Sequence, residues 1–312
     1  MSSRLLVLAW HNVDPTWCFP ARQGAGAHGL ARQLAFLARR CNVVPLGDAL
    51  AALDRSEPLP PRAVALTFDD GYRDQLKLAA PMLTQLGLPA TFFLVPGLLD
   101  RTARPWWEEL GWIFSRSSRD VVVFQGRTFQ LDSDTERQRS LLEVLEDLKR
   151  RDQTGREAAI DELRQRCAPQ GKLEEQASFL DWRGARELAR RGFTVASHSL
   201  NHAILAEEPP SEQERDLALS RELLEQELGL PVLLLAYPNG KRSDYSAATV
   251  AAAHRAGYSH ALTTLEGWNR PATASYEVRR FVIQPERGTP GLALVPLHPV
   301  WARVRAVRDR RR

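Results

Sequence analysis

The 312-residue chain is poor in cysteine and has no long apolar run. Its three cysteines (Cys18, Cys41 and Cys167) form no CxxC pair, which argues against a disulfide framework or a cysteine-only metal site. No apolar run approaches the roughly 18 residues needed to cross a bilayer, which excludes a transmembrane protein. The first residues lack the long apolar region and cleavage site of a secretory signal, so we expect a cytoplasmic protein.

Several common catalytic motifs are also missing. No GxSxG occurs, so serine hydrolase chemistry has no basis. Gly240 and Lys241 are followed by Arg242 and lack the upstream glycine of a phosphate-binding loop. The stretch 24–29 reads GxGxxG, but it begins well after the first expected strand ends, and two prolines intervene. A dinucleotide enzyme is therefore a weak alternative, which an absence of NAD binding would dismiss.

Positive charge is concentrated at one end of the chain. The net charge is +4, and residues 301–312 hold six Arg against one Asp, so the remainder is close to neutral. A neutral body does not predict nucleic-acid binding. The basic tail is either a solvated end or a peripheral contact with an anionic membrane, at its inner face.

Short apolar runs alternate with amphipathic stretches along most of the chain. The runs predict buried parallel strands, the stretches predict helices, and a glycine follows several of the stretches as a helix stop. This alternation indicates an α/β fold with helices outside a parallel sheet. The expected strands are 5–9, 63–68, 90–95, 193–196, 232–236, 259–263 and 278–283, and the expected helices are 32–40, 73–86, 182–191 and 211–228.

Residues 101–178 interrupt the alternation. They hold a hairpin-like stretch at 121–131 and charged helical segments such as 137–151, which predict a mostly helical insertion between two barrel units. This insertion either covers the site or is a solvated excursion. Trp106 and Trp107 within it are either core residues or a ligand platform.

Two adjacent carboxylates end an apolar strand in the sequence TFDDGY at 67–72. Side chains at the carboxyl end of a parallel strand face the place where barrels carry their active sites. Neighbouring carboxylates repel, so both stay ionised only beside a cation. One possibility is that one of Asp69 and Asp70 binds a metal while the other stays free as a base. The alternative is a cap for the helix at 73–86.

Two histidines follow a second strand in HSLNH at 198–202. On one turn of helix His198 and His202 would share a face and reach one ion. An Asp with two His is a common ligand set for Zn²⁺ or another transition ion, and it leaves positions open for water and substrate. The alternative is a pair of surface or cap histidines.

Two further strand ends carry candidate groups. AYPNG at 236–240 is a rigid turn whose backbone N–H groups could donate to an oxyanion, or it is only a turn. His11 ends the first expected strand and is either part of the site or an ordinary core or rim histidine.

Together these motifs resemble those of the polysaccharide deacetylase family, the NodB-homology carbohydrate esterases (carbohydrate esterase family 4-like), in its exopolysaccharide-type branch. The resemblance spans about residues 4–285, apart from much of the insertion. It implies a deformed (β/α) barrel at 1–290 with an insertion at about 101–178 and a basic tail at 291–312.

The same resemblance implies roles for individual residues. Asp69 matches the catalytic base. The metal ligands are Asp70, His198 and His202. The Asn239 backbone N–H matches the oxyanion donor, and His11 matches the strand-end histidine. We also assign substrate binding to three residues beside these motif positions, Tyr72, Tyr237 and Pro238.

The implied reaction is the metal-dependent hydrolysis of acetyl groups from N-acetylated sugars of a poly- or oligosaccharide, which breaks a carbon–nitrogen bond. Zn²⁺ is the expected metal, and Co²⁺, Ni²⁺ or Fe²⁺ would also fit the ligands. The expected partner is an acetylated glycan or a lipid-linked glycan, and no nucleic acid.

The chain departs from the family pattern at two places. Ala236 stands where many members carry an arginine that orients the catalytic Asp, so we expect Arg279 or Arg280 to take over. A late Leu-x-His that supplies the general acid is poorly matched at 295–298, which leaves His11 or water to protonate the amine. The alternative function is a catalytically impaired metal- or glycan-binding protein of the same fold.

Overall fold

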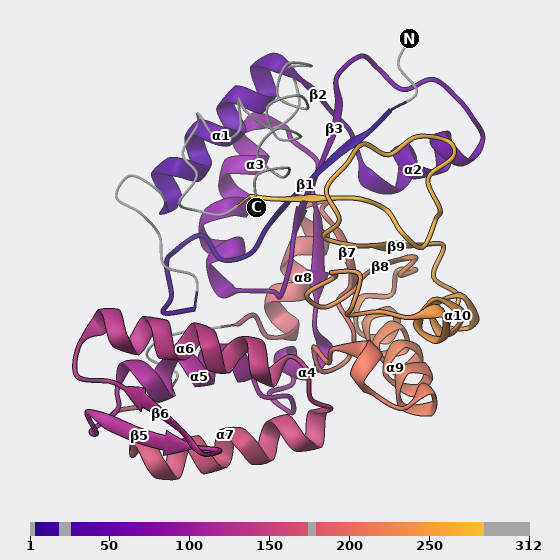
Figure 1. Ribbon diagram of the computed structural model, residues 1–312. Coiled ribbons are helices and arrows are strands. Elements are labelled where there is room, and N and C mark those ends of the chain that lie inside the picture. The colour runs from indigo at the N-terminus through magenta and orange to yellow at the C-terminus, as the bar shows by residue number, and fades with distance from the viewer. Residues whose placement is uncertain (1–3, 19–25, 174–178, 284–312) are drawn as a thin grey trace, which may run out of the picture.

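The computed structural model describes residues 4–18, 26–173 and 179–283, and its centre is an eight-stranded parallel sheet (Figure 1). The strand order is β10-β1-β3-β4-β7-β8-β9, with β2 beside β3. A parallel bridge joins Leu262 of β9, at one end of this order, to Val278, which precedes β10 at the other end. The sheet therefore curls into the deformed (β/α) barrel that was predicted. The strands are β1 (Leu6–Trp10), β2 (Asn42–Val43), β3 (Ala63–Phe68), β4 (Thr91–Leu94), β7 (Thr194–Ser197), β8 (Leu234–Ala236), β9 (His260–Leu262) and β10 (Phe281–Val282).

Strand side chains alternate between two cores. Leu66 and Phe68 of β3 point outward and join the large cluster beneath the helices. Ala63 and Ala65 of the same strand point inward, into a smaller cluster that fills the barrel. Because successive side chains of a strand face opposite sides, a strand buried on both faces is apolar throughout. The fully buried run of β3 therefore reads in the sequence as one continuous apolar segment.

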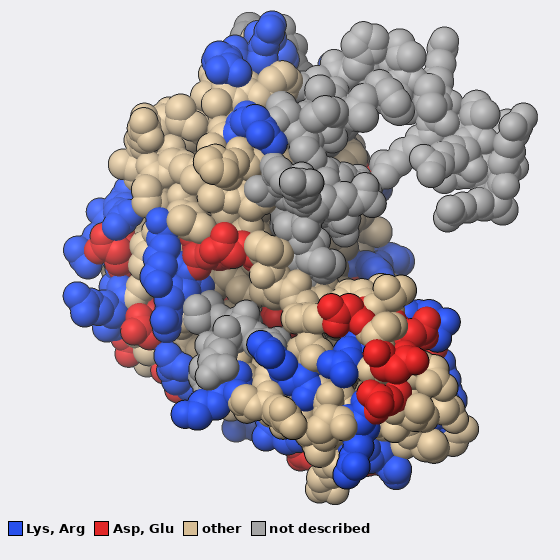
Figure 2. Space-filling model, turned by 90° about the vertical axis from the view of Figure 1, so that its left-hand side faces the viewer, with Lys and Arg blue, Asp and Glu red and all other residues tan. Residues whose placement is uncertain are grey.

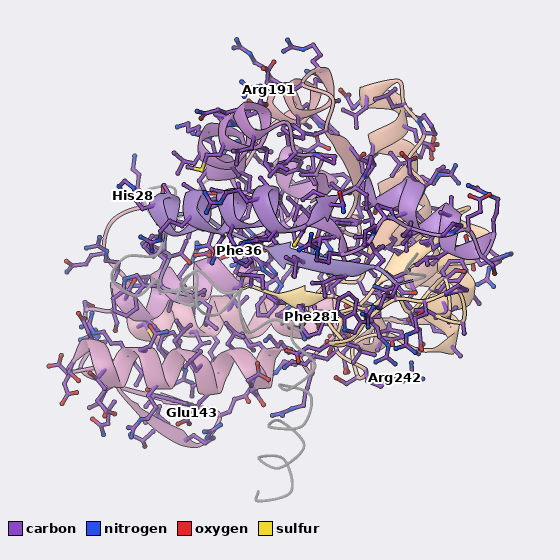
Figure 3. The ribbon with its side chains drawn as sticks, turned by 90° about the horizontal axis from the view of Figure 1, so that it is seen from above. His28, Phe36, Glu143, Arg191, Arg242 and Phe281 are labelled. Carbon is purple, nitrogen blue, oxygen red and sulfur yellow. The ribbon has the colours of Figure 1, made fainter. Side chains whose placement is uncertain are left out.

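Helices cover the outer face of the sheet. Phe36 of α1 packs against the core that includes Phe281 of β10, and Figure 3 shows both residues from above. Gly87 and Gly229 adopt left-handed φ angles of 64° and 65° and end their helices, as predicted. The helices are α1 (Gly26–Arg40), α2 (Leu46–Asp54), the π-helix η1 (Gln75–Ala79), α3 (Ala80–Leu86), α4 (Pro96–Leu99), α8 (Trp182–Arg190), the 3₁₀ turn η3 (Leu205–Glu207), α9 (Pro210–Leu228) and α10 (Ala247–Arg255).

In its described residues, up to 173, the insertion folds as three helices and a hairpin, below the barrel in Figure 1. Its elements are α5 (Trp106–Ser115), β5 (Val121–Phe124), β6 (Arg127–Gln130), α6 (Asp134–Leu148) and α7 (Gln153–Cys167). They share a hydrophobic cluster of their own, to which Val95 and Leu98 of the barrel also belong. Trp106 and Trp107 are both 4% exposed and lie in this cluster, in agreement with the prediction that they are core residues.

The outer surface mixes charges of both signs. Lys and Arg side chains are interspersed with Asp and Glu side chains on the face shown in Figure 2. Exposed ion pairs such as Arg127–Glu143 and Arg166–Glu162 neutralise the insertion locally. Among the described helices, none is both long and apolar enough to cross a membrane.

Candidate metal centre and catalytic carboxylate

The carboxyl ends of neighbouring parallel strands bring the predicted groups to one edge of the sheet. Asp69 and Asp70 follow β3, and His198 follows β7, which is separated from β3 only by β4. Asp70 has a left-handed φ of 73° and Gly71 one of 75°, so the chain turns sharply directly after the strand. This turn sends two consecutive carboxylates to different partners.

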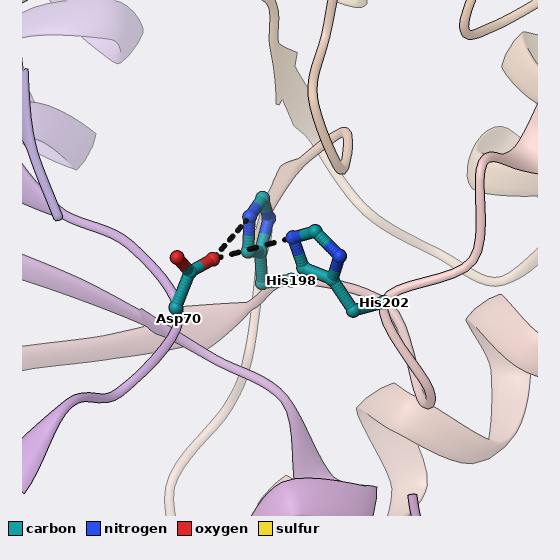
Figure 4. A group of neighbouring side chains, drawn as sticks. All are labelled: Asp70, His198 and His202. Carbon is teal, nitrogen blue, oxygen red and sulfur yellow. Dashed lines mark ion pairs between the residues drawn. The ribbon is translucent and has the colours of Figure 1, made fainter. Parts of the chain in front are cut away.

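Asp70, His198 and His202 form a compact group of possible ligands (Figure 4). Nε2 of each histidine lies 3.3 Å from Oδ1 of Asp70, and all three residues are buried. A tetrahedral ion with ligands at about 2.1 Å has neighbouring ligand atoms roughly 3.4 Å apart. The nitrogen–oxygen separations therefore match the edges of a tetrahedral metal site.

The hydrogen bonds around these atoms also suit a cation. Oδ1 of Asp70 is buried, and the two imidazole contacts lack hydrogen-bond geometry, so it has no donor among the described residues. Nδ1 of His198 lies 2.7 Å from the Ala236 carbonyl oxygen. That contact places a proton on Nδ1 and leaves the Nε2 lone pair facing Asp70. The residues present therefore fit a divalent metal.

Electrostatics favour the ligand form of Asp70 and His202 and the protonated form of His198. Burial alone would raise the pKa of Asp70, but the imidazoles of His198 and His202 hold it well below its usual range. Burial lowers the pKa of His202 and outweighs the opposing effect of Asp70. Burial would also lower the pKa of His198, yet Asp70 and Asp69 raise it above its usual value. Metal binding must therefore displace the proton of the His198 imidazolium at low pH.

The HxxxH segment is a loop, and the prediction of a helical turn is wrong. Ser199 and His202 have left-handed φ angles of 63° and 55°, which no helix contains. The Leu200 backbone N–H donates to Asp216 of α9 at 2.8 Å and helps to fix this loop. Two left-handed residues, and not a helical turn, bring the imidazoles together here.

Arg280 holds the second carboxylate. Its Nη1 donates to Oδ1 of Asp69 at 2.8 Å, and both side chains are at most 1% exposed. Burial would raise the pKa of Asp69, but Arg280, with His198 and His11, lowers it below its usual value. Of the two expected substitutes for the arginine missing at Ala236, the structure selects Arg280, because Arg279 is exposed.

His11 lies near the two carboxylates, and Asn239 follows β8 at the same edge of the sheet. His11 is half-buried and lies close enough to lower the pKa of both Asp69 and Asp70. Asn239 adopts a left-handed φ of 60°, and its side-chain amide donates to Asp244 at 2.6 Å. Their catalytic roles stay predictions.

The three residues expected to bind substrate are all buried. The Tyr72 hydroxyl already donates to Glu108 and accepts from Trp107. Tyr237 stacks on Tyr245 with ring centroids 4.7 Å apart, in the large cluster beneath the helices. Pro238 is buried beside it. Their contact with a glycan stays a prediction that these side-chain positions do not favour.

Three functional candidates were missed or only partly seen in the sequence. Trp107 was interpreted as a core residue or a ligand platform, without a link to the metal site, and Glu108 and Asp216 were not noted at all. A buried acid gives no local pattern, so only its place in the folded chain identifies it. Of the GxGxxG stretch, Gly26 begins α1 well after β1, while Gly24 lies outside the described residues, as do His298 and the basic tail.

Known proteins resemble this chain in sequence and in structure. The sequence model of the family described as polysaccharide deacetylase matches residues 56–261. The Bacillus subtilis (strain 168) protein YxkH, whose name places it among the polysaccharide deacetylases, is 27% identical over 108 residues. That match spans 35% of this chain and 36% of YxkH.

Solved structures share the fold along most of the chain. The Streptococcus pyogenes deacetylase PplD, solved in complex with acetate, superposes with a TM-score of 0.64 at 17% identity, over 96% of this chain and 100% of PplD. IcaB from Ammonifex degensii superposes with a TM-score of 0.58 at 20% identity, over 97% of this chain and 98% of IcaB. The BpsB deacetylase domain from Bordetella bronchiseptica superposes with a TM-score of 0.57 at 18% identity, over 90% of this chain and 96% of that domain.

The family match covers well over half of the chain and contains both TFDDGY and HSLNH. The shared fold and the grouping of the motif residues at one sheet edge agree with it. The chain belongs to the polysaccharide deacetylase family.

Proposed function

We propose that this protein is a metal-dependent deacetylase that hydrolyses the acetyl groups of N-acetylated sugars in a poly- or oligosaccharide. The observation that carries the proposal is the division of labour between two adjacent carboxylates. Asp70 faces two imidazoles at 3.3 Å, as a metal ligand would, whereas Asp69 pairs with Arg280. A ligand and a separate base side by side are what metal-assisted hydrolysis requires.

Asp70, His198 and His202 would hold the metal. An ion there supplies positive charge that polarises an acetyl carbonyl and makes a water molecule more acidic. The oxygen–nitrogen ligand set suits Zn²⁺, and Co²⁺, Ni²⁺ or Fe²⁺ would also fit.

The other residues move protons and stabilise charge. Asp69, kept ionised by Arg280, takes the proton of the attacking water. The Asn239 backbone N–H donates to the acetyl oxygen as negative charge develops on it. His11 gives a proton to the departing amine of the sugar. The products are acetate and an amino sugar.

The alternative is a binding protein that holds metal and glycan without turnover. The sequence feature that favoured this alternative is Ala236, which stands where an arginine was expected to orient the base. The Arg280–Asp69 pair supplies the same charge to the base from a residue next to β10, and this favours the active form.

The test is acetate release from N-acetylglucosamine oligomers and from an acetylated artificial ester, with and without chelator and with added Zn²⁺ or Co²⁺. We expect chelator-sensitive release that Asp70→Asn and His198→Ala abolish and His254→Ala, at an exposed position on α10, preserves. One equivalent of bound metal without acetate release would favour the binding protein. Full activity in Asp70→Asn would contradict the proposed site.

Location in the cytoplasm, a lipid-linked substrate and a membrane contact through the basic tail stay predictions. Vesicle sedimentation of the full chain, with and without residues 291–312, would test the last of these.

A further inference from the structure

We propose that Trp107 of the insertion is a positioning residue for His202, so that α5 forms part of the metal centre. This inference rests on the proposed metal site, and it assigns the insertion a function in place of a solvated excursion. The observation behind it is that the two histidines are held in different ways.

His198 has a hydrogen-bond partner behind its ring, and His202 does not. Nδ1 of His198 lies against the Ala236 carbonyl, whereas Nδ1 of His202 is buried with no hydrogen-bond partner among the described residues. Metal-binding histidines almost always use the second nitrogen to fix the ring. Some other contact must therefore orient His202.

The indole of Trp107 provides that contact. Its ring centroid lies 4.3 Å from that of His202, with the planes inclined at 43°. Both side chains are buried, so the contact is shielded from water. The electron-rich face of an indole attracts positive charge, and an imidazole that ligates a cation carries part of that charge. The contact therefore becomes more favourable when metal binds.

Hydrogen bonds hold the indole itself in place. Nε1 of Trp107 donates to the Tyr72 hydroxyl at 2.7 Å, and that hydroxyl donates to Oε1 of Glu108 at 2.8 Å. Thr16 donates to the same Glu108 oxygen, also at 2.8 Å. Tyr72 lies two residues after Asp70. Trp107 thus connects the segment that carries one ligand with the ring of another.

The experiment measures metal affinity and leaves turnover aside. Zn²⁺ affinity is determined by competition with a chromophoric chelator, the Co²⁺ form is examined by visible absorption, and the metal-free proteins are compared by thermal melting. The variants are Trp107→Leu and Trp107→Phe. The matched control is Trp112→Leu, which removes another buried indole of α5 that has no contact with the site among the described residues.

We expect Trp107→Leu to weaken Zn²⁺ binding about 10- to 100-fold and to change the Co²⁺ spectrum. Trp112→Leu should lower the melting temperature of the metal-free protein about as much as Trp107→Leu does. It should leave the Zn²⁺ affinity within about twofold of the wild-type value. Trp107→Phe keeps a ring face and loses the N–H, so its loss should be smaller. Tyr72→Phe removes the same hydrogen bond, so combining it with Trp107→Phe should add little further loss of affinity.

The outcomes separate this inference from the proposed function. Wild-type protein that binds no metal contradicts the metal-dependent function itself. Wild-type binding with unchanged affinity and spectrum in Trp107→Leu overturns the role of Trp107 alone. An equal loss of affinity in Trp112→Leu would show that α5 acts only through general packing, and would also overturn the inference.

Discussion

Nη1 of Arg280 lies 2.8 Å from Oδ1 of Asp69, although 211 residues separate them in the chain. The guanidinium also donates through Nε to the Thr263 carbonyl at 3.0 Å and lies over the ring of Phe93. A residue next to β10 therefore orients a carboxylate at the end of β3, across the strand between them. This pair gives Asp69 the charge partner that Ala236 cannot supply.

Replacing Arg280 should impair both stability and turnover. Arg280→Gln leaves a buried carboxylate without its charge partner, which costs about 3–5 kcal/mol of unfolding free energy. Loss of an oriented base should lower kcat roughly 10²–10⁴-fold. Urea unfolding and acetate release measure the two effects.

Arg279→Gln is the matched control, because Arg279 is the adjacent residue and is exposed. It should change the unfolding free energy by no more than about 0.5 kcal/mol. Wild-type kcat in Arg280→Gln would show that Asp69 needs no such partner.

Stability should fall as the pH rises through neutrality because of Glu108. Burial raises its pKa to about 7, against the hydrogen bonds from Tyr72 and Thr16. The folded state therefore binds a proton that the unfolded state has lost. This contribution is complete below about pH 4.5 and disappears as the pH rises through about 7, a change of about 3 kcal/mol.

Glu108→Gln removes that titration. Urea unfolding of metal-free protein between pH 4.5 and 8 should show a wild-type stability that declines relative to the variant by about this amount. Asp74 and Asp216 also have raised pKa values, of about 6 and about 7, and titrate in both proteins. Parallel curves for the two proteins would refute the assignment to Glu108.

Asp216 should affect metal affinity without contacting the metal. Its carboxylate accepts the Leu200 backbone N–H within the loop that joins the two histidines. Asp216→Ala frees this loop and should weaken Zn²⁺ binding by about tenfold, while Asp216→Asn retains an acceptor and should lose less. Chelator competition measures this effect. Glu212→Ala, at an exposed position of the same helix, should bind as the wild type does.

Gly97 should tolerate no side chain, because the same loop passes directly over it. A Cβ there would lie 2.6 Å from Oδ1 of Asn201 and 2.8 Å from the Leu200 carbonyl oxygen. Gly97→Ala should cost about 1–3 kcal/mol and weaken metal binding as the loop moves. Gly47→Ala meets nothing within 4 Å in α2 and should stabilise the protein by up to about 1 kcal/mol. Thermal melting of the two variants should therefore shift in opposite directions.

Local patterns in the sequence were enough to predict most of the barrel. Every expected strand overlaps an observed one, since a strand buried on both faces must be apolar along its whole length. The two-residue strand β2, the helices α2, α4 and α10 and the 3₁₀ turn η3 were missed. For α10 a signal was present, since Ser246 and Thr249 form a capping box.

The chemical types at the site could also be inferred from the chain, because carboxylates and imidazoles follow apolar runs in three motifs. How those groups are held could not be inferred. Arg280 reaches Asp69 from a position next to β10, Trp107 reaches His202 from the insertion, and the HxxxH segment is a loop.

The elements of the barrel were predictable and the contacts that hold the site were not, for a physical reason. Strands and helices obey short-range rules of periodicity, turn geometry and capping, which neighbouring residues express in the sequence. The Arg280–Asp69 ion pair and the Trp107–His202 ring contact join residues far apart in the chain, and their orientation depends on burial that exists only after the barrel and the insertion have packed.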